Sequence, residues 1–513
     1  MAGTDIPHVF VVHGDITHLA CDAWLLPTDQ NLSITSGWHK SLPDLNARLA
    51  SADLSDLNSG SALAAPLPAI DGEPLIIATA VPLHGFTDPN DLRPALRAYA
   101  VTANGSVTNP SHRRARRLFA LPFFGTAGGG GANRRGAIFD ALHAEARSLA
   151  AELDVDFVFV FRDEPSYALA QQRRRVVGRL ATALPEYLHG EAKRLAELAR
   201  AGRLVPFLGA GVSVSAGAPT WARLIELLAE NRGLSVDERE SILQPDRDPL
   251  DQAAYLRMLF DEGDEADAAR AFQGAIAAAV RRDRYGLAPA LLASLDAEQA
   301  ITLNYDELFE LACADAGRPR RIIPGGASDS ERWLLKLHGT VNDPSTIVLT
   351  REDYLGFNAD RAALSALVKA TLMTRHLLFV GFGMRDDHFH EIVHDVRRAV
   401  GSQSSGLAAT ALTLRDDPLH KALWSKHLET VSISEADDAE LALAARRLEV
   451  FLDVMMCEAS DSHSYLLHHD FAEALTPAEH QLAVALRAAT EAARKAGVSL
   501  DRAGGWILSK NAR

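Results

Sequence analysis

A glycine-rich turn within residues 204–221 has the residue types best suited to holding a phosphate group. The segment LVPFLGAGVSVSAGAPTW predicts an apolar strand, a Gly-x-Gly turn and the start of a helix. Gly209 and Gly211 have no Cβ, so the backbone can approach a pyrophosphate while amides at the helix start point toward the anion. Ser213 adds a hydroxyl donor. The next glycine, Gly217, comes six residues after Gly211 instead of three, which favours a nucleotide loop that does not serve hydride transfer. A purely structural strand-to-helix turn is the alternative.

Three later segments repeat the pattern of an apolar strand followed by polar residues or glycine. They are AITLNYD at 300–306, WLLKLHGT at 333–340 and LLFVGFGMRDDHF at 377–389. The first presents Asn304 and Asp306 at its end, and the second presents His338. Ligands of parallel sheets bind at the carboxyl ends of the strands, so these side chains are candidates for chemistry. Each also has a structural interpretation, as a turn or cap residue or as a histidine bonded to backbone.

The four segments, in this order, resemble the sirtuin-like family, and specifically its bacterial NAD-hydrolysing branch of antiphage defence, over about residues 195–435. The resemblance implies a Rossmann-like domain with a parallel sheet and a helical insert, with NAD as substrate. It implies that Asn304 orients the nicotinamide ribose and a water molecule and that His338 is the general base. The implied NAD-contacting residues are Gly209, Ala210, Gly211, Ser213, Asp306, Gly381, Gly383 and Asp386, with Asp386 or Asp387 completing a helix cap or a ribose contact.

The chemistry fits these residue types. Cleavage of the nicotinamide–ribose bond passes through an oxocarbenium-like state, which needs a positioned nucleophile and a base with a pKa near neutrality. Deacylating sirtuins carry a zinc module of paired Cys-x-x-Cys ligands, but the only cysteines here are Cys21, Cys313 and Cys457, far apart in the chain. We therefore expect no zinc and favour water as the acceptor. A deacylase or an ADP-ribosyltransferase is an alternative enzyme, and a non-catalytic sensor of NAD-derived nucleotides is an alternative of another class.

A competing metal motif occurs at residues 390–394, which read His-Glu-Ile-Val-His. On a helix, this spacing places two imidazoles one turn apart, as in zinc proteases. The motif directly follows the glycine turn at 381–387 and lacks a Gly-x-x-His extension, and 19 histidines make a chance match plausible. The sequence therefore predicts no metal site.

The first 190 residues resemble a macro domain. Residues 10–29 predict a strand, a Gly-Asp turn and a second strand, and residues 118–131 predict a strand that runs into a glycine-rich loop. The resemblance implies an ADP-ribose-type ligand, with Asp15 at the adenine. The diphosphate would lie on Gly125, Thr126, Gly128, Gly129 and Gly130. Pro27-Thr28-Asp29 replaces the usual asparagine pair, which argues for binding without turnover. A plain surface loop is the alternative.

Length and composition agree with several α/β domains. The 513 residues are 47% hydrophobic and 23% charged, so we expect a macro-like α/β/α domain at 1–190, a sirtuin-like domain at 191–435 and a helical segment at 436–513. The net charge of −15 argues against nucleic acid as a partner. The sequence shows no signal peptide or membrane span, so we expect a cytoplasmic location. A homo-oligomer is expected, and a protein activator encoded by a phage or in the same operon is one candidate trigger.

Overall fold

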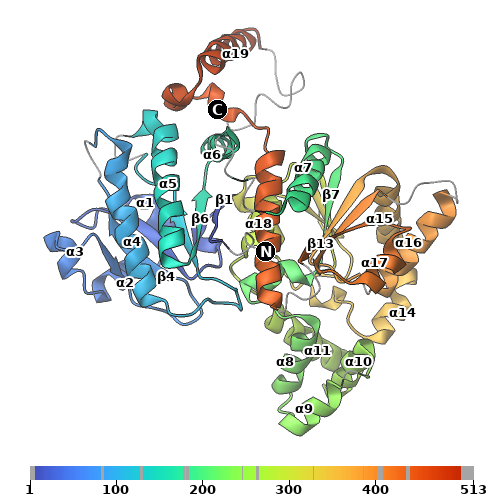
Figure 1. Ribbon diagram of the computed structural model, residues 1–513. Coiled ribbons are helices and arrows are strands. Elements are labelled where there is room, and N and C mark those ends of the chain that lie inside the picture. Colours follow the sequence, from blue (N-terminus) through green and yellow to red (C-terminus); the bar gives the residue numbers. More distant parts are fainter. Residues whose placement is uncertain are drawn as a thin grey trace. The chain divides into compact units, whose positions relative to one another are not determined.

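The computed structural model describes residues 6–82, 86–126, 131–176, 180, 184–244, 246–260, 265–326, 329–384, 386–400, 408–434 and 440–497. The chain divides into two compact units. The first comprises the described parts of 1–193, 315–317 and 450–513, and the second comprises those of 194–314 and 318–449. Each unit is built around its own β-sheet (Figure 1).

The first unit contains a six-stranded sheet in the order β1-β6-β5-β2-β4-β3. All its pairs are parallel except β3 with β4, which is antiparallel. Side chains on both faces of the inner strands are buried, as parallel strands require. The strands are β1 (Val9–His13), β2 (Ala23–Thr28), β3 (Ala64–Pro66), β4 (Leu75–Ala80), β5 (Leu118–Pro122) and β6 (Asp156–Phe161).

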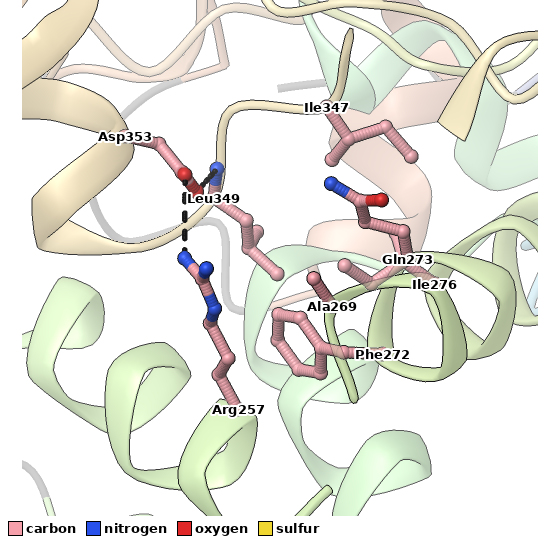
Figure 2. Close-up of a pocket in the computed structure, with 8 residues that line it drawn as sticks. All are labelled: Arg257, Ala269, Phe272, Gln273, Ile276, Ile347, Leu349 and Asp353. Atoms are coloured by element: carbon pink, nitrogen blue, oxygen red, sulfur yellow. Dashed lines mark hydrogen bonds and ion pairs between the residues drawn. The ribbon is translucent and has the colours of Figure 1, made fainter. Parts of the chain in front are cut away.

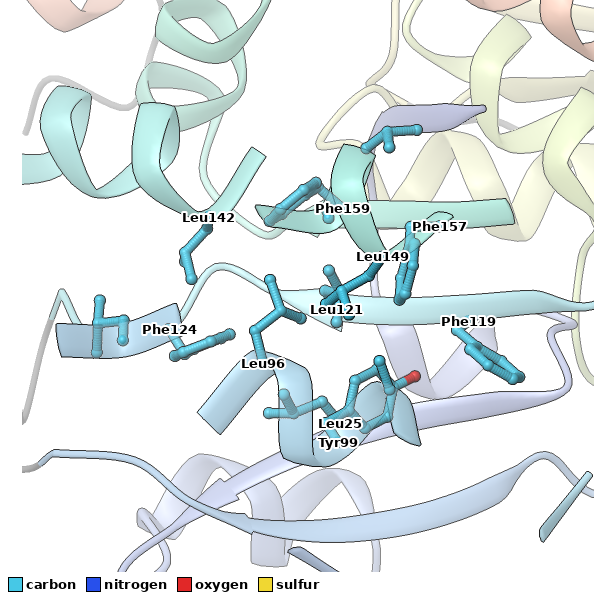
Figure 3. Close-up of a cluster of buried hydrophobic side chains, with 14 of the residues drawn as sticks. Leu25, Leu96, Tyr99, Phe119, Leu121, Phe124, Leu142, Leu149, Phe157 and Phe159 are labelled. Carbon is cyan, nitrogen blue, oxygen red and sulfur yellow. The ribbon is translucent and has the colours of Figure 1, made fainter. Parts of the chain in front are cut away.

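Helices α4 (Arg93–Ser106) and α5 (Arg135–Leu153) pack on one face of this sheet and form its main core. Figure 3 shows leucine and phenylalanine side chains of the two helices and the strands meeting in this cluster. Tyr99 of α4 is fully buried, and its hydroxyl donates to the carbonyls of Ala23 and Ala120, both at 3.0 Å, so the helix is fixed to two strands. The unit also contains α1 (Ser36–Ser41), α2 (Leu45–Ser51), α3 (Ser55–Ser59), α6 (Glu164–Val176) and α19 (Pro477–Lys495).

A buried ion pair attaches the C-terminal part of the chain to the first unit. Helix α18 (Leu441–Ala459) carries Asp453, whose carboxylate is fully buried. It accepts hydrogen bonds from Arg174 Nη1 at 3.0 Å and pairs with His8 Nε2 at 2.7 Å. Burial alone would raise the pKa of Asp453, but Arg174 and His8 hold it at about 2. The end of α18 is therefore bound to the chain just before β1 and to α6.

The second unit contains a seven-stranded sheet in which all pairs are parallel. Its order is β13-β12-β11-β7-β8-β10-β9. Strands β8 to β10 therefore lie on one side of β7, and strands β11 to β13 lie on the other side. The ends of β7 and β11 thus form the switch point at which α/β sheets bind ligands. The strands are β7 (Leu204–Leu208), β8 (Gln299–Thr302), β9 (Arg321–Ile323), β10 (Trp333–Lys336), β11 (His376–Val380), β12 (Ala409–Arg415) and β13 (Glu429–Ser434).

Two groups of helices accompany this sheet. One face packs on α14 (Arg351–Asp360), α15 (Ala362–Thr374) and α16 (Asp387–Val400). A helical insert with its own apolar cluster lies between β7 and β8 in the chain; it comprises α8 (Trp221–Asn231), α9 (Val236–Ile242), α10 (Pro249–Leu259) and α11 (Glu265–Val280). The remaining helices are α7 (Glu186–Arg200), α12 (Leu287–Ala293), α13 (Leu308–Asp315) and α17 (Pro418–Trp424).

The predicted mixed α/β class, with a Rossmann-like parallel sheet and a helical insert, is confirmed. Strand β12 is followed by β13, which forms the edge of the sheet. The macro-like assignment of the first unit stays a prediction. Among the residues with assigned positions, no helix is both long and apolar enough to cross a bilayer.

Candidate active site

The two glycine turns at the switch point pack directly against each other. Gly209 N–H donates to the carbonyl of Val380 at 3.0 Å, and Gly211 N–H donates to the carbonyl of Gly381 at 2.9 Å. A Cβ on Gly209 would lie 2.5 Å from the Gly381 oxygen, and a Cβ on Gly381 would lie 2.5 Å from the Val212 nitrogen. Gly381 also has a φ of +64°, which disfavours other residues. The absence of a Cβ at these glycines therefore allows the backbones of the two loops to pack against each other.

The remaining predicted residues of these turns have different surroundings. The helix that follows Gly209 is a 3-10 helix, Ala210–Ala216, in which Ser213 is buried. Gly383 is exposed, and a Cβ there would meet no atom within 4 Å. The fold therefore does not require glycine at 383, in contrast to 381.

Asn304 links the end of β8 to the first glycine turn. Its side chain is buried, and Nδ2 donates to the carbonyl of Gly209 at 3.1 Å and lies 3.4 Å from the hydroxyl of Ser213. The Asn304 N–H donates to the hydroxyl of Thr302 at 3.0 Å. Because a carbonyl oxygen can only accept, the amide nitrogen must face Gly209, and the amide oxygen is the atom directed elsewhere. The structure thus brings three predicted residues together here.

A buried lysine that the sequence reasoning missed supports this loop. Lys336 is only 1% exposed, and its Nζ donates to the carbonyl of Asp306 at 2.5 Å and to Glu310 Oε1 at 2.5 Å. Burial raises the pKa of Glu310, and Lys336 opposes that shift. The carboxylate of Asp306 is itself buried and accepts from Leu308 N–H at 3.1 Å, so it caps the turn before α13. Lys336 lies within the strand segment quoted above, but no spacing rule marks it as an internal cation.

His338 and Asn304 follow paired strands that are in register. Thr302 pairs with Lys336 across β8 and β10, and each of the two candidate residues comes two positions later. The imidazole is 4% exposed. Burial lowers the pKa of His338 to about 4, a shift that Asp386 opposes and that His388 and Arg361 reinforce. The ring is therefore neutral at pH 7, and its pKa lies below the near-neutral value expected for the base.

Three side chains from α14 and the start of α16 surround His338. His338 Nε2 lies 3.5 Å from His388 Nδ1 and 3.7 Å from Asp386 Oδ2. Asp386 Oδ2 accepts from the hydroxyl of Tyr354 at 2.7 Å, while Oδ1 accepts from Phe389 N–H at 3.0 Å and so caps α16. His388 Nε2 lies 3.0 Å from the carbonyl of Tyr354.

The sequence offered only weak signals for two of these neighbours. His388 lies in the segment 377–389, in which the sequence analysis selects the acidic residues Asp386 and Asp387 and not this histidine. Tyr354 follows a capping box, in which Thr350 and Asp353 exchange hydrogen bonds at the start of α14. That box locates the helix but does not indicate that the tyrosine faces a histidine.

The His-Glu-x-x-His motif takes no part in this cluster. His390 Nε2 lies 2.9 Å from the carbonyl of Met384, and its ring packs edge-on against Trp424. His394 is exposed. Within the described ranges, the side chains close enough together to hold a metal ion are those of His338, Asp386 and His388. His390, Glu391 and His394 are not among them.

The candidate residues of the first unit are engaged in local structure. Asp15 caps a short turn, accepting from Thr17 N–H at 3.0 Å, and forms an ion pair with Arg162 at 2.7 Å. Gly125 has a φ of +84°, and a Cβ there would lie 2.6 Å from Leu92. Thr126 is buried. Gly128, Gly129 and Gly130 lie outside the described residues.

A pocket in the second unit lies where the helical insert meets the chain before α14 (Figure 2). Arg257 of α10 and Asp353 of α14 form an ion pair at 3.7 Å beside it, and Leu349 N–H donates to Asp353 Oδ2 at 3.0 Å. The pocket is lined by Arg257, Ala269, Phe272, Gln273, Ile276, Ile347, Leu349 and Asp353, none of which is a predicted site residue.

Comparison with known families identifies the part of the chain that carries this cluster. Residues 298–433 match the SIR2-like domain family. The match begins just before β8 and ends within β13, so it includes Asn304, His338 and Asp386 but not the first glycine turn.

Curated relatives align with about 40% of the chain. It is 28% identical over 218 residues to "Defense-associated sirtuin 2" of Bacillus subtilis, which is 40% of this chain and 20% of the relative. It is also 28% identical over 218 residues to "NAD(+) hydrolase ThsA" of Enterococcus faecium, covering 40% and 42%. The protein of the same name from Bacillus cereus (strain MSX-D12) is 26% identical over 199 residues, covering 38% and 40%. The aligned part thus spans between a fifth and about two fifths of the relatives' length.

Proposed function

We propose that this chain is an NAD+ glycohydrolase that cleaves NAD+ to nicotinamide and ADP-ribose. The observation that carries the proposal is that Asn304 and His338 each come two residues after the end of one of two paired parallel strands, and that Asn304 contacts the first glycine turn of the switch point. The names of the relatives, "NAD(+) hydrolase" and "Defense-associated sirtuin", support the same chemistry. By analogy, we propose an antiphage role in which the enzyme depletes cellular NAD.

The reaction we propose needs few groups. Nicotinamide leaves with the electron pair of the C–N bond, and the ribose passes through an oxocarbenium-like state that water captures. The Asn304 amide, fixed by Gly209, orients the ribose and the water through its oxygen. His338, neutral at pH 7, accepts the proton that the water loses. The products are nicotinamide, ADP-ribose and a proton.

We propose that the dinucleotide lies across the switch point. Its phosphates would contact the backbone near Gly209, Ala210 and Gly211 and the hydroxyl of Ser213. The remaining contacts would come from Asp306, Gly381, Gly383 and Asp386. Of these, Gly383 has the clearest room for a ligand, because it is exposed and no atom lies near its Cβ position.

For the rest of the chain we propose a regulatory role. The macro-like first unit would bind an ADP-ribose-type ligand through Asp15, Gly125, Thr126 and the glycines that follow, and that occupancy would regulate the enzyme. A homo-oligomer and a separate protein activator are further proposed means of control.

The decisive experiment incubates the purified full chain with NAD+ and follows nicotinamide release by chromatography. His338→Ala and Asn304→Ala are expected to lose release, whereas His394→Ala, which removes an exposed histidine of α16, is expected to retain it. Acyl-ribose products or labelled protein instead of free ADP-ribose would indicate the alternative enzymes. NAD+ binding without release by the wild type would narrow the choice to an enzyme that awaits its activator and a sensor.

A further inference from the structure

Three potential metal ligands converge at His338. His338, Asp386 and His388 each offer one ligand atom, and the three atoms lie within 4.8 Å of one another. Both imidazoles are buried, and the side chain of Asp386 is 9% exposed. This combination of two histidines and one carboxylate provides the nitrogen and oxygen ligands that Zn²⁺ accepts.

The spacing is close to that of a tetrahedral zinc site. Ligand atoms at about 2.0–2.2 Å from Zn²⁺ stand about 3.3–3.6 Å from one another. The observed separations from His338 Nε2 are 3.5 Å to His388 Nδ1 and 3.7 Å to Asp386 Oδ2. Only shifts of a few tenths of an ångström would be needed along these two edges, and a water molecule would complete the fourth position.

The hydrogen bonds around the cluster orient two of the ligands. The carbonyl of Tyr354 can only accept, so His388 Nε2 carries a proton, and Nδ1 is the ring nitrogen left to face His338 and bind a metal ion. The Tyr354 hydroxyl donates to Asp386 Oδ2, and Phe389 N–H donates to Oδ1. Metal-binding histidines and carboxylates in proteins are usually held by outer partners of this kind. One residue, Tyr354, thus positions both ligands.

Aromatic rings of α14 pack against both histidines of the cluster. His388 is stacked between Tyr354 at 4.3 Å and Phe357 at 3.8 Å between ring centroids. His338 contacts the edges or faces of the same two rings at 5.5 and 5.9 Å.

We propose that His338, Asp386 and His388 form a Zn²⁺ site that inhibits the enzyme reversibly. The inhibitory consequence rests on the proposed hydrolase function, since His338 Nε2 cannot both coordinate an ion and accept a proton from water. Binding of zinc does not depend on that function and is measured separately.

The test begins with full-length protein stripped of metal by EDTA and desalted. Zn²⁺ binding is measured by competition with a chromophoric chelator, and Co²⁺ is added in parallel to detect the visible absorption of a tetrahedral site. We expect one bound ion per chain. In His388→Phe, which keeps the stacked ring but removes the nitrogen, the loss of affinity should exceed the roughly 10- to 100-fold typical of losing an outer partner.

Two further variants make the result specific. Tyr354→Phe, which loses only the hydroxyl bond to Asp386, should weaken Zn²⁺ binding by about tenfold. His394→Ala should bind as the wild type does, because this histidine of the same helix is exposed and outside the cluster. Circular dichroism confirms that each variant is folded.

The outcomes separate the two proposals. Zinc binding that depends on His388, with nicotinamide release that zinc blocks and EDTA restores, supports both. The same binding without any nicotinamide release supports the metal site and does not support the hydrolase. Absence of binding, or equal binding by the wild type, His388→Phe and Tyr354→Phe, overturns the metal site whatever the activity.

Discussion

Replacement of Lys336 by methionine tests whether the buried cation beneath the candidate site stabilises the second unit. The ammonium group is the partner of Glu310, at 2.5 Å, and of the carbonyls of Asp306 and Tyr305, at 2.5 and 3.3 Å. Removing one member of a buried ion pair costs about 3–5 kcal/mol, because the other charge is left without a partner. The Glu310 side chain is 18% exposed, which lets water offset part of that cost. We therefore expect the free energy of unfolding to fall by about 3 kcal/mol.

Urea unfolding of the full chain, followed by tryptophan fluorescence, measures this change; Trp333 lies on the same strand as Lys336. The matched control is Lys369→Met, which removes a lysine paired with Asp395 at 2.7 Å on partly exposed helices and should cost less than about 1 kcal/mol. A loss for Lys336→Met as small as that of the control would refute the reasoning.

The pH dependence gives a second check on the same variant. Burial raises the pKa of Glu310, and loss of Lys336 removes an interaction that lowers it. A carboxyl group with a raised pKa in the folded state contributes stability at low pH that disappears as the pH rises through that pKa. The defect of Lys336→Met should therefore be smaller at pH 5 than at pH 8, and Glu310→Gln added to it should recover at least about 1 kcal/mol at pH 8.

Three further outcomes are expected. Gly381→Ala should destabilise the second unit by about 2 kcal/mol or more in urea unfolding, because its Cβ would lie 2.5 Å from the Val212 nitrogen at a φ of +64°, whereas Gly383→Ala should unfold as the wild type does. If His338 is the base, the acid limb of kcat/KM for NAD+ should lie near pH 4 and not near 6.5, because burial keeps the ring neutral; a limb above pH 6 would contradict this. Asp386→Asn should move that limb to lower pH, since the Asp386 charge raises the pKa of His338; an upward shift would show that another group titrates.

The strands that carry the site could be predicted because their signals are local. Each consists of a short apolar run that ends in glycine or a polar residue, and the observed strands β7, β8, β10 and β11 end next to Gly209, Asn304, His338 and Gly381. The rule that ligands meet the carboxyl ends of parallel strands then selects those side chains. The edge strands β9 and β13 were not predicted: β9 has only three residues, and polar residues interrupt the apolar run of β13, which reads ETVSIS.

The C-terminal part of the chain shows the limit of such patterns. The periodicity of α18 indicates an amphipathic helix but does not say which partner it packs against. The interaction of Asp453 with His8 and Arg174 joins residues more than 270 positions apart, so no local signal could have shown it.

The sequence by itself determined the class of fold, the four strand ends and the residue types offered there, because strand and turn preferences depend on neighbouring residues. Only the tertiary structure decided what those residues touch. It placed the backbone of Gly381 against Gly211, a lysine beneath the loop of Asn304, and Tyr354 and His388 around His338. Such contacts depend on how separate helices and strands pack, and burial then fixes the charge of the groups that meet.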